Sequence, residues 1–382
     1  MSNNIMHKKV LLFFPANKTT IAMISLFKAL RAEGVEMELL TILPKDVLHH
    51  QLEELGFKTH SLELDTNPIS WYKLISKSYR FFKASSATVI FSHLKPCTLV
   101  TLVLEKFISQ KVFSFRHHID HPDAIKQFPE LINKNQLRGD ALLNKFAPNQ
   151  IVPCKTVMDG MIKEEKANPN RLSIIPYMYD FDMYPKADTN WINNERLNKK
   201  AQLRILLCSR LVPVKRHMLA LQVLKKLIID KQLDIQVYIL DKGPEEEKIQ
   251  KYINENQLNN NVTMVGFTQR YIDYMALCDV LLHPSVSEAS NSVVKEMALQ
   301  GTPSIVCAGV GDFSDYIVHG ENGFLIKVLN PQEEIESIVM KIYHDKSALS
   351  KIGEEAKKSV LNLFSINRET TFKYITLLES VR

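Results

Sequence analysis

Two polar loops in the C-terminal half of the sequence carry the side chains best suited to chemistry. One loop holds Arg210 and Lys215, and the other holds Glu288 and Glu296. Paired cations would neutralise a diphosphate and stabilise it as a leaving group. A carboxylate accepts two hydrogen bonds from a vicinal diol, so two carboxylates suit a ligand with hydroxyl pairs at both ends, such as a nucleotide sugar. The alternative for the first loop is an ordinary solvated basic loop. The alternative for the second loop is that Glu296 only interacts favourably with a helix dipole and that Glu288 is solvated.

The elements around these loops predict how the side chains are held. The apolar run Val280–Leu282 predicts a strand, and the polar stretch after it reaches Asn291 and Ser292, both favourable helix N-caps. A helix that starts there would present backbone N–H groups at the carboxyl edge of a sheet, where phosphate binds well. Arg210 likewise follows a predicted strand, Ile205–Cys208.

The whole chain alternates short apolar runs with longer amphipathic ones, which favours parallel sheets covered by helices on both faces. The further predicted strands are Val10–Phe14, Glu36–Thr41, Thr88–Phe91, Val112–Phe115, Gln150–Val152, Ser173–Ile175, Gln236–Leu240, Thr263–Val265 and Ser304–Val306. Helices are expected between them, for example at Ile21–Ala32 and Leu137–Phe146, and Pro176–Lys200 predicts an interdomain linker. We therefore expect two tandem doubly wound domains with the ligand in a cleft between them, since ligands bind outside the carboxyl ends of such sheets.

Composition argues against several other classes of protein. Hydrophobic residues make up 45% and charged residues 24% of the chain, so domain-scale disorder is not expected. Most of the net charge of +6 lies in the first half. It is too small to indicate nucleic acid, but it would suit an anionic substrate or membrane surface. No apolar run is long enough to span a bilayer. The five cysteines form no Cys-x-x-Cys pair, which predicts reduced thiols in a cytoplasm.

The order of short motifs over residues 204–326 resembles the retaining glycosyltransferases of family 4, which have the GT-B architecture. That family carries an Arg-Leu-x-x-x-Lys loop, matched here at Arg210 and Lys215. It also carries two glutamates separated by seven residues, matched at Glu288 and Glu296. The remaining matches are the turn Gly243–Pro244, the pair Gly266–Phe267, Asp279, and the stretches QGTPSIV and HGENGFLI.

The resemblance implies a role for each matched residue. Arg210 and Lys215 would contact the diphosphate of a nucleotide diphosphate sugar, Glu296 would hold the ribose hydroxyls, and Glu288 would touch hydroxyls of the donor sugar. The remaining donor contacts would come from the backbone of Ser290, Asn291, Ser292 and Val293, and from Gly266 and Phe267 near the base. No Asp-x-Asp pair lies where metal-dependent transferases place it, so we expect a metal-independent reaction without a cofactor, in which Arg and Lys supply the charge.

The sequence departs from the family pattern at several positions. Ala289–Asn291 replace glycines that are usual in the glutamate loop, which points to a different donor. Ser209 stands where glycine is usual before the arginine, and Arg216 stands where glycine often follows the lysine. The stretch Pro15–Thr20 lacks the glycine-rich loop that follows the family's first strand, so a close backbone approach is not expected there. Tyr177–Met178 replace an Asn-Gly turn near the domain junction.

A histidine cluster follows the predicted strand Val112–Phe115. The family places a functional histidine after this strand, and either His117 or His118 could fill that role, with His117 nearer the strand end. Arg116 could add a phosphate contact. His93, after another predicted strand, is a weaker candidate, because a lone histidine is more often structural.

The segment Trp71–Lys83 predicts an amphipathic helix. Its apolar face would hold Trp71, Ile75, Tyr79 and Phe82, and its basic face would hold Lys73, Lys77, Arg80 and Lys83. The ordinary interpretation buries the apolar face in the core. The alternative is a peripheral contact with an anionic membrane, which would suit a lipid-linked acceptor at the inner face of the plasma membrane.

We therefore expect a GT-B fold of two Rossmann-like domains. Residues 1–185 would form the acceptor side, with the C-terminal helix 364–382 packing back on it, and residues 186–363 would bind the nucleotide sugar. The expected activity is sugar transfer with retention, from a UDP-sugar by base rate, to a glycan or lipid-linked acceptor in cell-surface polysaccharide or lipopolysaccharide biosynthesis. Two alternatives remain: a sugar-nucleotide epimerase on the same architecture, and a non-catalytic sugar-nucleotide-binding protein.

Overall fold

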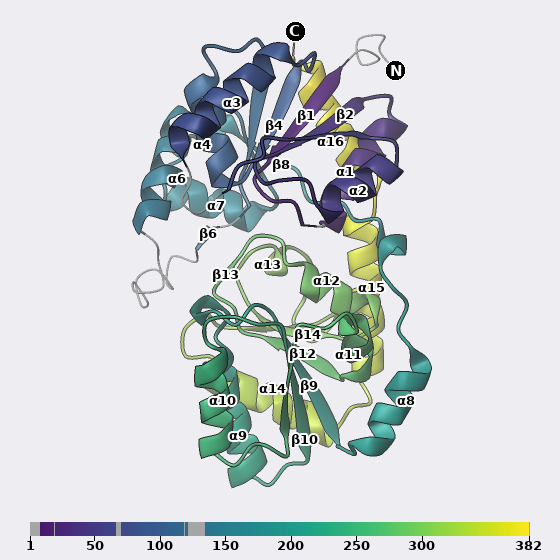
Figure 1. The fold of residues 1–382 in the computed structure, drawn as a ribbon. Coiled ribbons are helices and arrows are strands. Elements are labelled where there is room, and N and C mark those ends of the chain that lie inside the picture. Colours follow the sequence, from purple (N-terminus) through teal and green to yellow (C-terminus); the bar gives the residue numbers. More distant parts are fainter. Residues whose placement is uncertain (1–7, 19, 66–69, 118, 121–133, 382) are drawn as a thin grey trace. The chain divides into compact units, whose positions relative to one another are not determined.

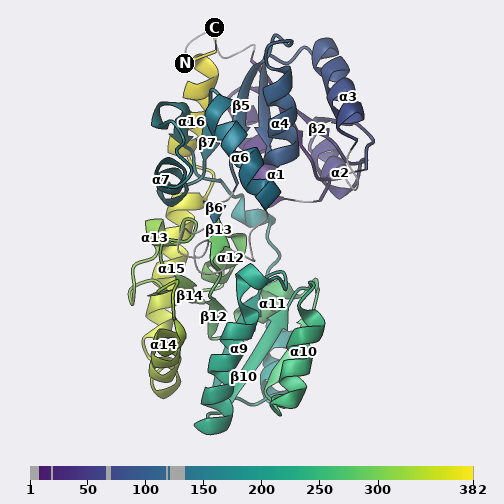
Figure 2. The ribbon, with the colours of Figure 1, turned by 90° about the vertical axis from the view of Figure 1, so that its left-hand side faces the viewer.

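The computed structural model describes residues 8–18, 20–65, 70–117, 119–120 and 134–381. The chain divides into two compact units. Unit 1 comprises residues 1–117, 133–183 and 364–382, and unit 2 comprises residues 118–132 and 184–363. In each unit a parallel sheet is flanked by helices on both faces (Figures 1 and 2).

Unit 1 is built on a seven-stranded sheet in the order β3-β2-β1-β4-β5-β7-β8, with every neighbouring pair parallel. Its strands are β1 (Lys9–Phe14), β2 (Glu36–Thr41), β3 (Lys58–Ser61), β4 (Val89–His93), β5 (Lys111–Phe115), β7 (Gln150–Val152) and β8 (Leu172–Ile174). The chain runs outward from β1 to β3 and then continues from β4 on the other side of β1. The carboxyl ends of β1 and β4 therefore flank the point where the strand order reverses, which is where ligands of doubly wound sheets bind.

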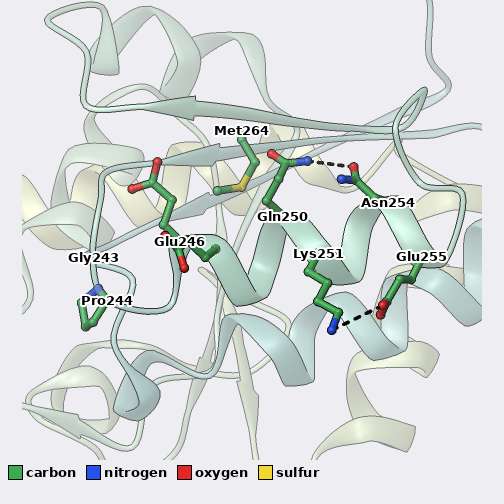
Figure 3. A pocket seen from close by; sticks show the side chains of 9 residues that line it. Gly243, Pro244, Glu246, Gln250, Lys251, Asn254, Glu255 and Met264 are labelled. Carbon is green, nitrogen blue, oxygen red and sulfur yellow. Dashed lines mark hydrogen bonds and ion pairs between the residues drawn. The ribbon is translucent and has the colours of Figure 1, made fainter.

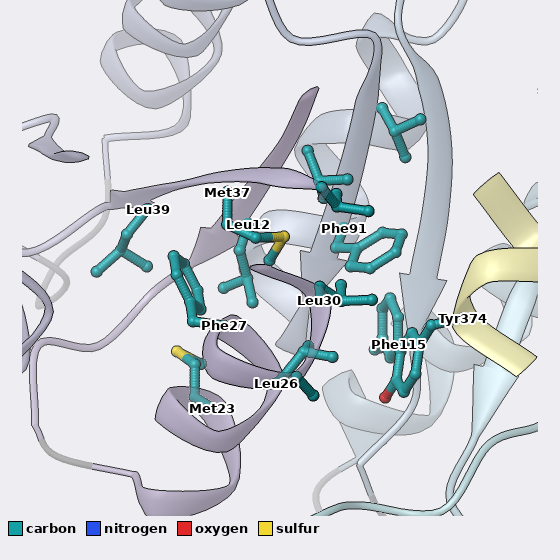
Figure 4. Close-up of a cluster of buried hydrophobic side chains, with 14 of the residues drawn as sticks. Leu12, Met23, Leu26, Phe27, Leu30, Met37, Leu39, Phe91, Phe115 and Tyr374 are labelled. Atoms are coloured by element: carbon teal, nitrogen blue, oxygen red, sulfur yellow. The ribbon is translucent and has the colours of Figure 1, made fainter. Parts of the chain in front are cut away.

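Helices cover both faces of this sheet because consecutive strand residues point to opposite sides. Leu12 of β1 belongs to the cluster that packs on α1 and α16, whereas Leu11 and Phe13 belong to the cluster under α3 and α4. Figure 4 shows the first cluster, with Tyr374 of α16 beside Phe115. The helices of unit 1 are α1 (Ile21–Ala32), α2 (Val47–Glu54), α3 (Trp71–Ala84), α4 (Leu94–Leu104), α6 (Lys134–Phe146), α7 (Lys155–Lys163) and α16 (Arg368–Glu379).

Unit 2 repeats the plan with a six-stranded parallel sheet in the order β11-β10-β9-β12-β14-β15. Its strands are β9 (Leu203–Cys208), β10 (Ile235–Leu240), β11 (Val262–Gly266), β12 (Val280–His283), β14 (Ser304–Cys307) and β15 (Phe324–Ile326). A short antiparallel pair joins β13 (Ser287–Glu288) to β6 (Ile119–Asp120). The helices are α8 (Thr189–Asn198), α9 (His217–Lys225), α10 (Glu246–Glu255), α11 (Tyr271–Leu277), α12 (Ser292–Leu299), α13 (Phe313–Tyr316), α14 (Gln332–His344) and α15 (Leu349–Phe364). Strand order reverses between β9 and β12.

Every predicted strand is present within one or two residues, but some other boundaries were wrong. The predicted linker contains the helix α8, which Asp188 caps through its side chain. The predicted C-terminal helix is α16, which starts at Arg368 and not at Phe364, after the cap Asn367, whose Oδ1 accepts from Thr370 N at 2.8 Å. Strands β3 and β15 were not predicted: both are short strands at the edges of their sheets, and β3 contains no apolar residue.

Helix α3 buries a different stripe from the predicted one. Leu74, Ser78 and Phe82 are buried, and the rings of Phe13 and Phe82 meet edge to face at 5.4 Å. Trp71 and Tyr79, predicted on the apolar face, are 45% and 38% exposed. The buried residues are spaced four apart and so lie on one face of the helix. The small side chain of Ser78 lets this face approach the sheet closely. No described helix is long and apolar enough to cross a bilayer.

Candidate functional site

The two predicted loops of unit 2 meet where its strand order reverses. Arg210 and Lys215 follow β9, and Glu288 follows β12, which is the neighbour of β9 in the sheet. Because the strands are parallel, both loops leave the same edge. The sheet therefore brings together cations and a carboxylate that are more than 70 residues apart in the sequence.

Lys215 and Glu288 are in direct contact. Lys215 Nζ donates to Glu288 Oε1 and to the backbone carbonyl of Ser287 at 3.3 Å. His283 Nε2 lies 2.7 Å from the same Oε1. Burial alone would raise the pKa of Glu288, but the hydrogen bonds and charges of His283 and Lys215 outweigh it and hold the pKa well below its usual value. Glu288 is therefore held as a carboxylate across the physiological pH range.

Arg210 differs from Lys215 in having an exposed side chain. Its guanidinium makes no hydrogen bond or ion pair with any other residue that the structure describes. The backbone next to it is fixed, because Leu211 N donates to Lys242 O and Leu211 O accepts from Glu245 N. A Cβ on Gly243 would lie 2.4 Å from Leu211 O, so only glycine permits this packing. The loop is thus held in place while the cation stays available to an anion.

Arg216 and His217, which follow Lys215 in the sequence, are not placed to bind a diphosphate. Arg216 is buried and donates from Nη1 to Val328 O at 2.7 Å. Its φ of +60° is the left-handed conformation that glycine adopts most easily, at the position where the related family often has glycine. Burial, followed by the charges of His283 and Lys215, lowers the pKa of His217 to about 3, so this ring is neutral.

The predicted helix start after Glu288 is present. Helix α12 begins at Ser292, and Asn291 caps it, since Asn291 Oδ1 accepts from Val294 N at 3.1 Å. The first backbone N–H groups of α12, including those of Ser292 and Val293, lie at the carboxyl edge of the sheet, where an anion is favoured. Glu296 lies one turn further along this helix.

Glu296 is buried in a less polar setting than Glu288. Burial raises the pKa of Glu296 to about 7, and hydrogen bonds from Ser292 and Tyr184 offset only part of this shift. A carboxyl group that is half ionised near neutral pH gains from any ligand that donates hydrogen bonds to it. Tyr184 was not anticipated from the sequence.

A buried ion pair supports the glutamate loop. Lys295 Nζ lies 2.7 Å from Asp312 Oδ2 and 3.0 Å from Ser290 Oγ, and Ser290 Oγ donates to Asp312 Oδ2 at 2.6 Å. Lys295 and Asp312 are both almost fully buried. Gly311 brings its loop close to Ala289, because a Cβ there would lie 2.8 Å from Ala289 O. Sequence reasoning missed this network, although a lysine inside the apolar run of α12 was a visible signal.

Gly266 and Phe267 follow β11, which is separated from β9 by β10 in the sheet. Gly266 has a φ of +74°, so the chain turns sharply there. Phe267 follows with 76% of its surface exposed, and such a ring can stack on a planar base.

In unit 1 the histidine candidates lie at the carboxyl ends of β4 and β5. His93 Nδ1 and His117 Nε2 are 3.0 Å apart, and His117 Nδ1 is hydrogen-bonded to Tyr177 Oη. His118 lies outside the described residues. Arg116 is committed to unit 1, since its guanidinium pairs with Asp140 at 2.8 Å and with Glu165 at 2.7 Å. The expected phosphate contact of Arg116 is therefore not supported.

Two of the hollows formed by the described residues bear on the search for a ligand site away from the glutamate loop. One, of about 780 Å³, runs along α10 in unit 2 and is lined by Gly243, Pro244, Glu246, Glu247, Gln250, Lys251, Asn254, Glu255 and Met264 (Figure 3). Its three glutamates against one lysine disfavour a diphosphate. The other, of about 170 Å³, is a mainly apolar cavity in unit 1 beside His93, His117 and Tyr177.

The described residues hold no group of three or more His, Cys, Asp or Glu arranged to bind a metal ion. All five cysteines are buried and form no disulfide.

The fold and this edge define a two-unit α/β protein of the GT-B type. The structure resembles that of Anabaena Alr3699/HepE in complex with UDP-glucose, with a TM-score of 0.77, 18% identity, and coverage of 98% of this chain and 100% of that one. It also resembles sucrose-phosphate synthase from Thermosynechococcus elongatus, with a TM-score of 0.79, 15% identity, and coverage of 98% and 99%. At these identities the likeness shows the fold alone.

Residues 189–359 match the family model described as Glycosyl transferases group 1. The segment includes the residues of both charged loops, and with the fold it supports that family for this chain. Among curated proteins, N-acetyl-alpha-D-glucosaminyl L-malate synthase of Bacillus anthracis is 24% identical over 236 residues, 60% of this chain and 60% of that protein. Poly(ribitol-phosphate) alpha-N-acetylglucosaminyltransferase of Staphylococcus aureus (strain COL) is 25% identical over 246 residues, 64% of this chain and 49% of that protein. The chain thus spans about half to three fifths of these relatives.

Proposed function

We propose that this chain is a glycosyltransferase that moves a sugar from a uridine diphosphate sugar to a glycan or lipid-linked acceptor, with retention and without a metal ion. The observation that supports this most strongly is the contact of Lys215 with Glu288 at the edge of unit 2, next to the start of α12. A site with a fixed cation, a fixed carboxylate and exposed helix N–H groups suits a ligand that carries both a diphosphate and hydroxyl pairs.

The donor would lie along this edge in a fixed direction. Arg210, the first N–H groups of α12 and Lys215 would meet the diphosphate, and Glu296 would accept from the ribose hydroxyls. Phe267 would stack on the base. This arrangement assigns the buried carboxyl of Glu296 to the part common to all uridine donors.

Glu288 would recognise the transferred sugar. Lys215 and His283 both contact Oε1, so Oε2 can accept from a sugar hydroxyl. In the reaction the bond from the sugar C1 to the phosphate oxygen breaks, and a bond from C1 to the acceptor oxygen forms on the same face. The acceptor proton passes to the departing diphosphate, whose charge Lys215 and Arg210 would stabilise.

The acceptor side is proposed on the resemblance and on the names of the relatives. Two of these relatives are named as transferases of N-acetylgalactosamine to a diphospho-undecaprenol-linked sugar and of N-acetylglucosamine to poly(ribitol-phosphate). We assign this chain to cell-surface polysaccharide biosynthesis in the cytoplasm at the inner face of the plasma membrane. Exposed Trp71, Tyr72 and Tyr79 with the lysines of α3 would provide the membrane contact.

The proposal is tested by incubating the purified protein with a panel of nucleotide sugars and measuring the nucleoside diphosphate released with and without polyprenyl-linked and polyol-phosphate acceptors. Release should occur with one uridine donor and should be abolished in Glu288→Ala and Arg210→Ala. The anomeric coupling constant of the product tests retention. A new sugar nucleotide formed without release would indicate an epimerase, and binding without either reaction would indicate a non-catalytic protein.

A further inference from the structure

Three side chains of unit 1 form a hydrogen-bonded row at the carboxyl edge of its sheet. His93 ends β4, His117 follows β5, and Tyr177 follows β8. His93 Nδ1 and His117 Nε2 are 3.0 Å apart, and His117 Nδ1 is hydrogen-bonded to Tyr177 Oη. Both ring nitrogens of His117 are therefore engaged within unit 1.

His93 determines which atom donates and which accepts in each hydrogen bond of this row. Its ring is buried and stacks on Phe115, with ring centres 4.2 Å apart and planes at 6°. Its Nε2 is also buried and has no hydrogen-bond partner among the described residues. Burial lowers the pKa of His93 well below its usual value, so the ring is neutral and carries one proton.

The position of that proton follows from the free-energy cost of burying a polar atom without a hydrogen-bond partner. A buried N–H without an acceptor is among the rarest features of folded proteins, whereas a bare acceptor is tolerated more often. The proton of His93 therefore belongs on Nδ1, where His117 Nε2 accepts it. A neutral His117 that accepts at Nε2 carries its own proton on Nδ1 and donates it to Tyr177 Oη. The hydroxyl of Tyr177 then directs its proton away from His117.

We propose that His93 is a positioning residue that holds His117 as the Nδ1–H tautomer, and that the hydroxyl of Tyr177, rather than the ring of His117, donates to an oxygen of the bound ligand. Tyr177 is half-buried and stands where the related family has an Asn-Gly turn. All three residues of the row line the 170 Å³ cavity, whose other walls are mainly apolar, for example Leu12, Met23 and Leu26. Only the identity of the ligand, a sugar nucleotide or its acceptor, rests on the proposed function.

The tautomers can be measured directly in the full-length protein. Long-range proton–nitrogen correlation spectra of protein labelled with ¹⁵N-histidine distinguish Nδ1–H from Nε2–H rings, and single His→Gln variants assign the signals. We expect both His93 and His117 as Nδ1–H forms in the wild-type protein. In His93→Phe, which keeps a ring against Phe115, we expect His117 to change to the Nε2–H form, whereas His50→Gln on the exposed side of α2 should change nothing at His117. A wild-type His117 in the Nε2–H form would overturn the proposal, and this result needs no variant to fold.

Measuring donor turnover distinguishes a ligand contact made by Tyr177 from one made by His117. With the uridine sugar that the wild-type protein turns over fastest, Tyr177→Phe and His93→Phe should each lower kcat/KM by about tenfold, and the double variant should be no worse than either single one. Full activity of Tyr177→Phe together with loss of activity in His117→Gln would show that His117 contacts the ligand itself. If the wild-type protein turns over no sugar nucleotide, the proposed function fails, and the tautomers still decide the role of His93.

Discussion

His283 Nε2 lies 2.7 Å from Glu288 Oε1, and both side chains are buried at the end of β12. Lys215 donates to the same oxygen from the loop after β9. The carboxylate is thus fixed from two neighbouring strands before any ligand arrives. Such fixed geometry matters because a group that is already oriented loses little entropy when it binds.

Removing His283 should leave Glu288 charged but less firmly oriented for binding the donor. In His283→Phe the ring volume is largely kept, but one hydrogen bond to a carboxylate is lost, which is worth about 1.5–3 kcal/mol. We therefore expect kcat/KM for the donor to fall by about 10- to 100-fold. His344→Phe on the exposed surface of α14 is the matched control. Unchanged kinetics in a folded His283→Phe would show that His283 does not orient Glu288.

Donor affinity should depend on pH through Glu296. Burial raises the pKa of this carboxyl to about 7, so it is increasingly protonated below neutral pH and then accepts fewer hydrogen bonds from a ribose diol. The dissociation constant should rise by up to about tenfold for each pH unit below 7 and stay flat above it. Calorimetry with UDP-glucose avoids the titrating terminal phosphate of UDP. Glu296→Gln should bind weakly and show no such dependence, and a wild-type profile that is flat from pH 5 to 8 would argue against this role.

Because Lys295 and Asp312 form a buried ion pair, replacing one of them should lower the free energy of unfolding much more than replacing both. Lys295→Met leaves Asp312 charged and unpaired in the interior, which should lower the free energy of unfolding by about 3–5 kcal/mol. Lys295→Met/Asp312→Asn removes both charges and should recover most of this loss. Urea unfolding of the four proteins of the cycle measures the coupling. A loss in the double variant equal to the sum of the two single losses would mean that the pair adds no stability.

Membrane contact through α3 should require its exposed aromatic residues. Trp71→Ala/Tyr72→Ala should reduce sedimentation with vesicles that contain phosphatidylglycerol, because these rings would enter the interface while the basic residues meet the headgroups. Phe372→Ala on α16 removes an equally exposed ring of unit 1 and should have no effect. If the wild-type protein fails to sediment with anionic vesicles, the proposed contact is wrong.

Much of the fold could be predicted because its signals are local. Buried parallel strands are nearly continuous apolar runs, so Gln150–Val152 and Glu36–Thr41 could be located to the residue. Edge strands such as β3 bury less and give a weaker signal. Helix α3 shows a further limit: the apolar pattern identified the helix, but packing against Phe13 decided which face is buried.

The candidate site was likewise predicted only in part. Lys215 and Glu288 were placed in one expected site by the family resemblance, and in the structure they are in contact because they follow neighbouring strands. His283, Asp312 and Tyr184 were missed, since their significance comes from contacts between distant segments. Arg216 and His217 show a related limit, since sequence reveals a basic side chain but not its burial.

The most direct test of the account is donor turnover in a variant that lacks both cations of the β9 loop. Arg210→Ala/Lys215→Ala should lower kcat/KM for the uridine sugar by about 10²- to 10⁴-fold, because two charge-assisted hydrogen bonds to the diphosphate are lost. Lys248→Ala/Lys251→Ala on the exposed face of α10 removes the same charge from unit 2 and should retain full activity. If the β9-loop variant keeps wild-type turnover while folded, these cations do not bind the donor, and the proposed site is contradicted.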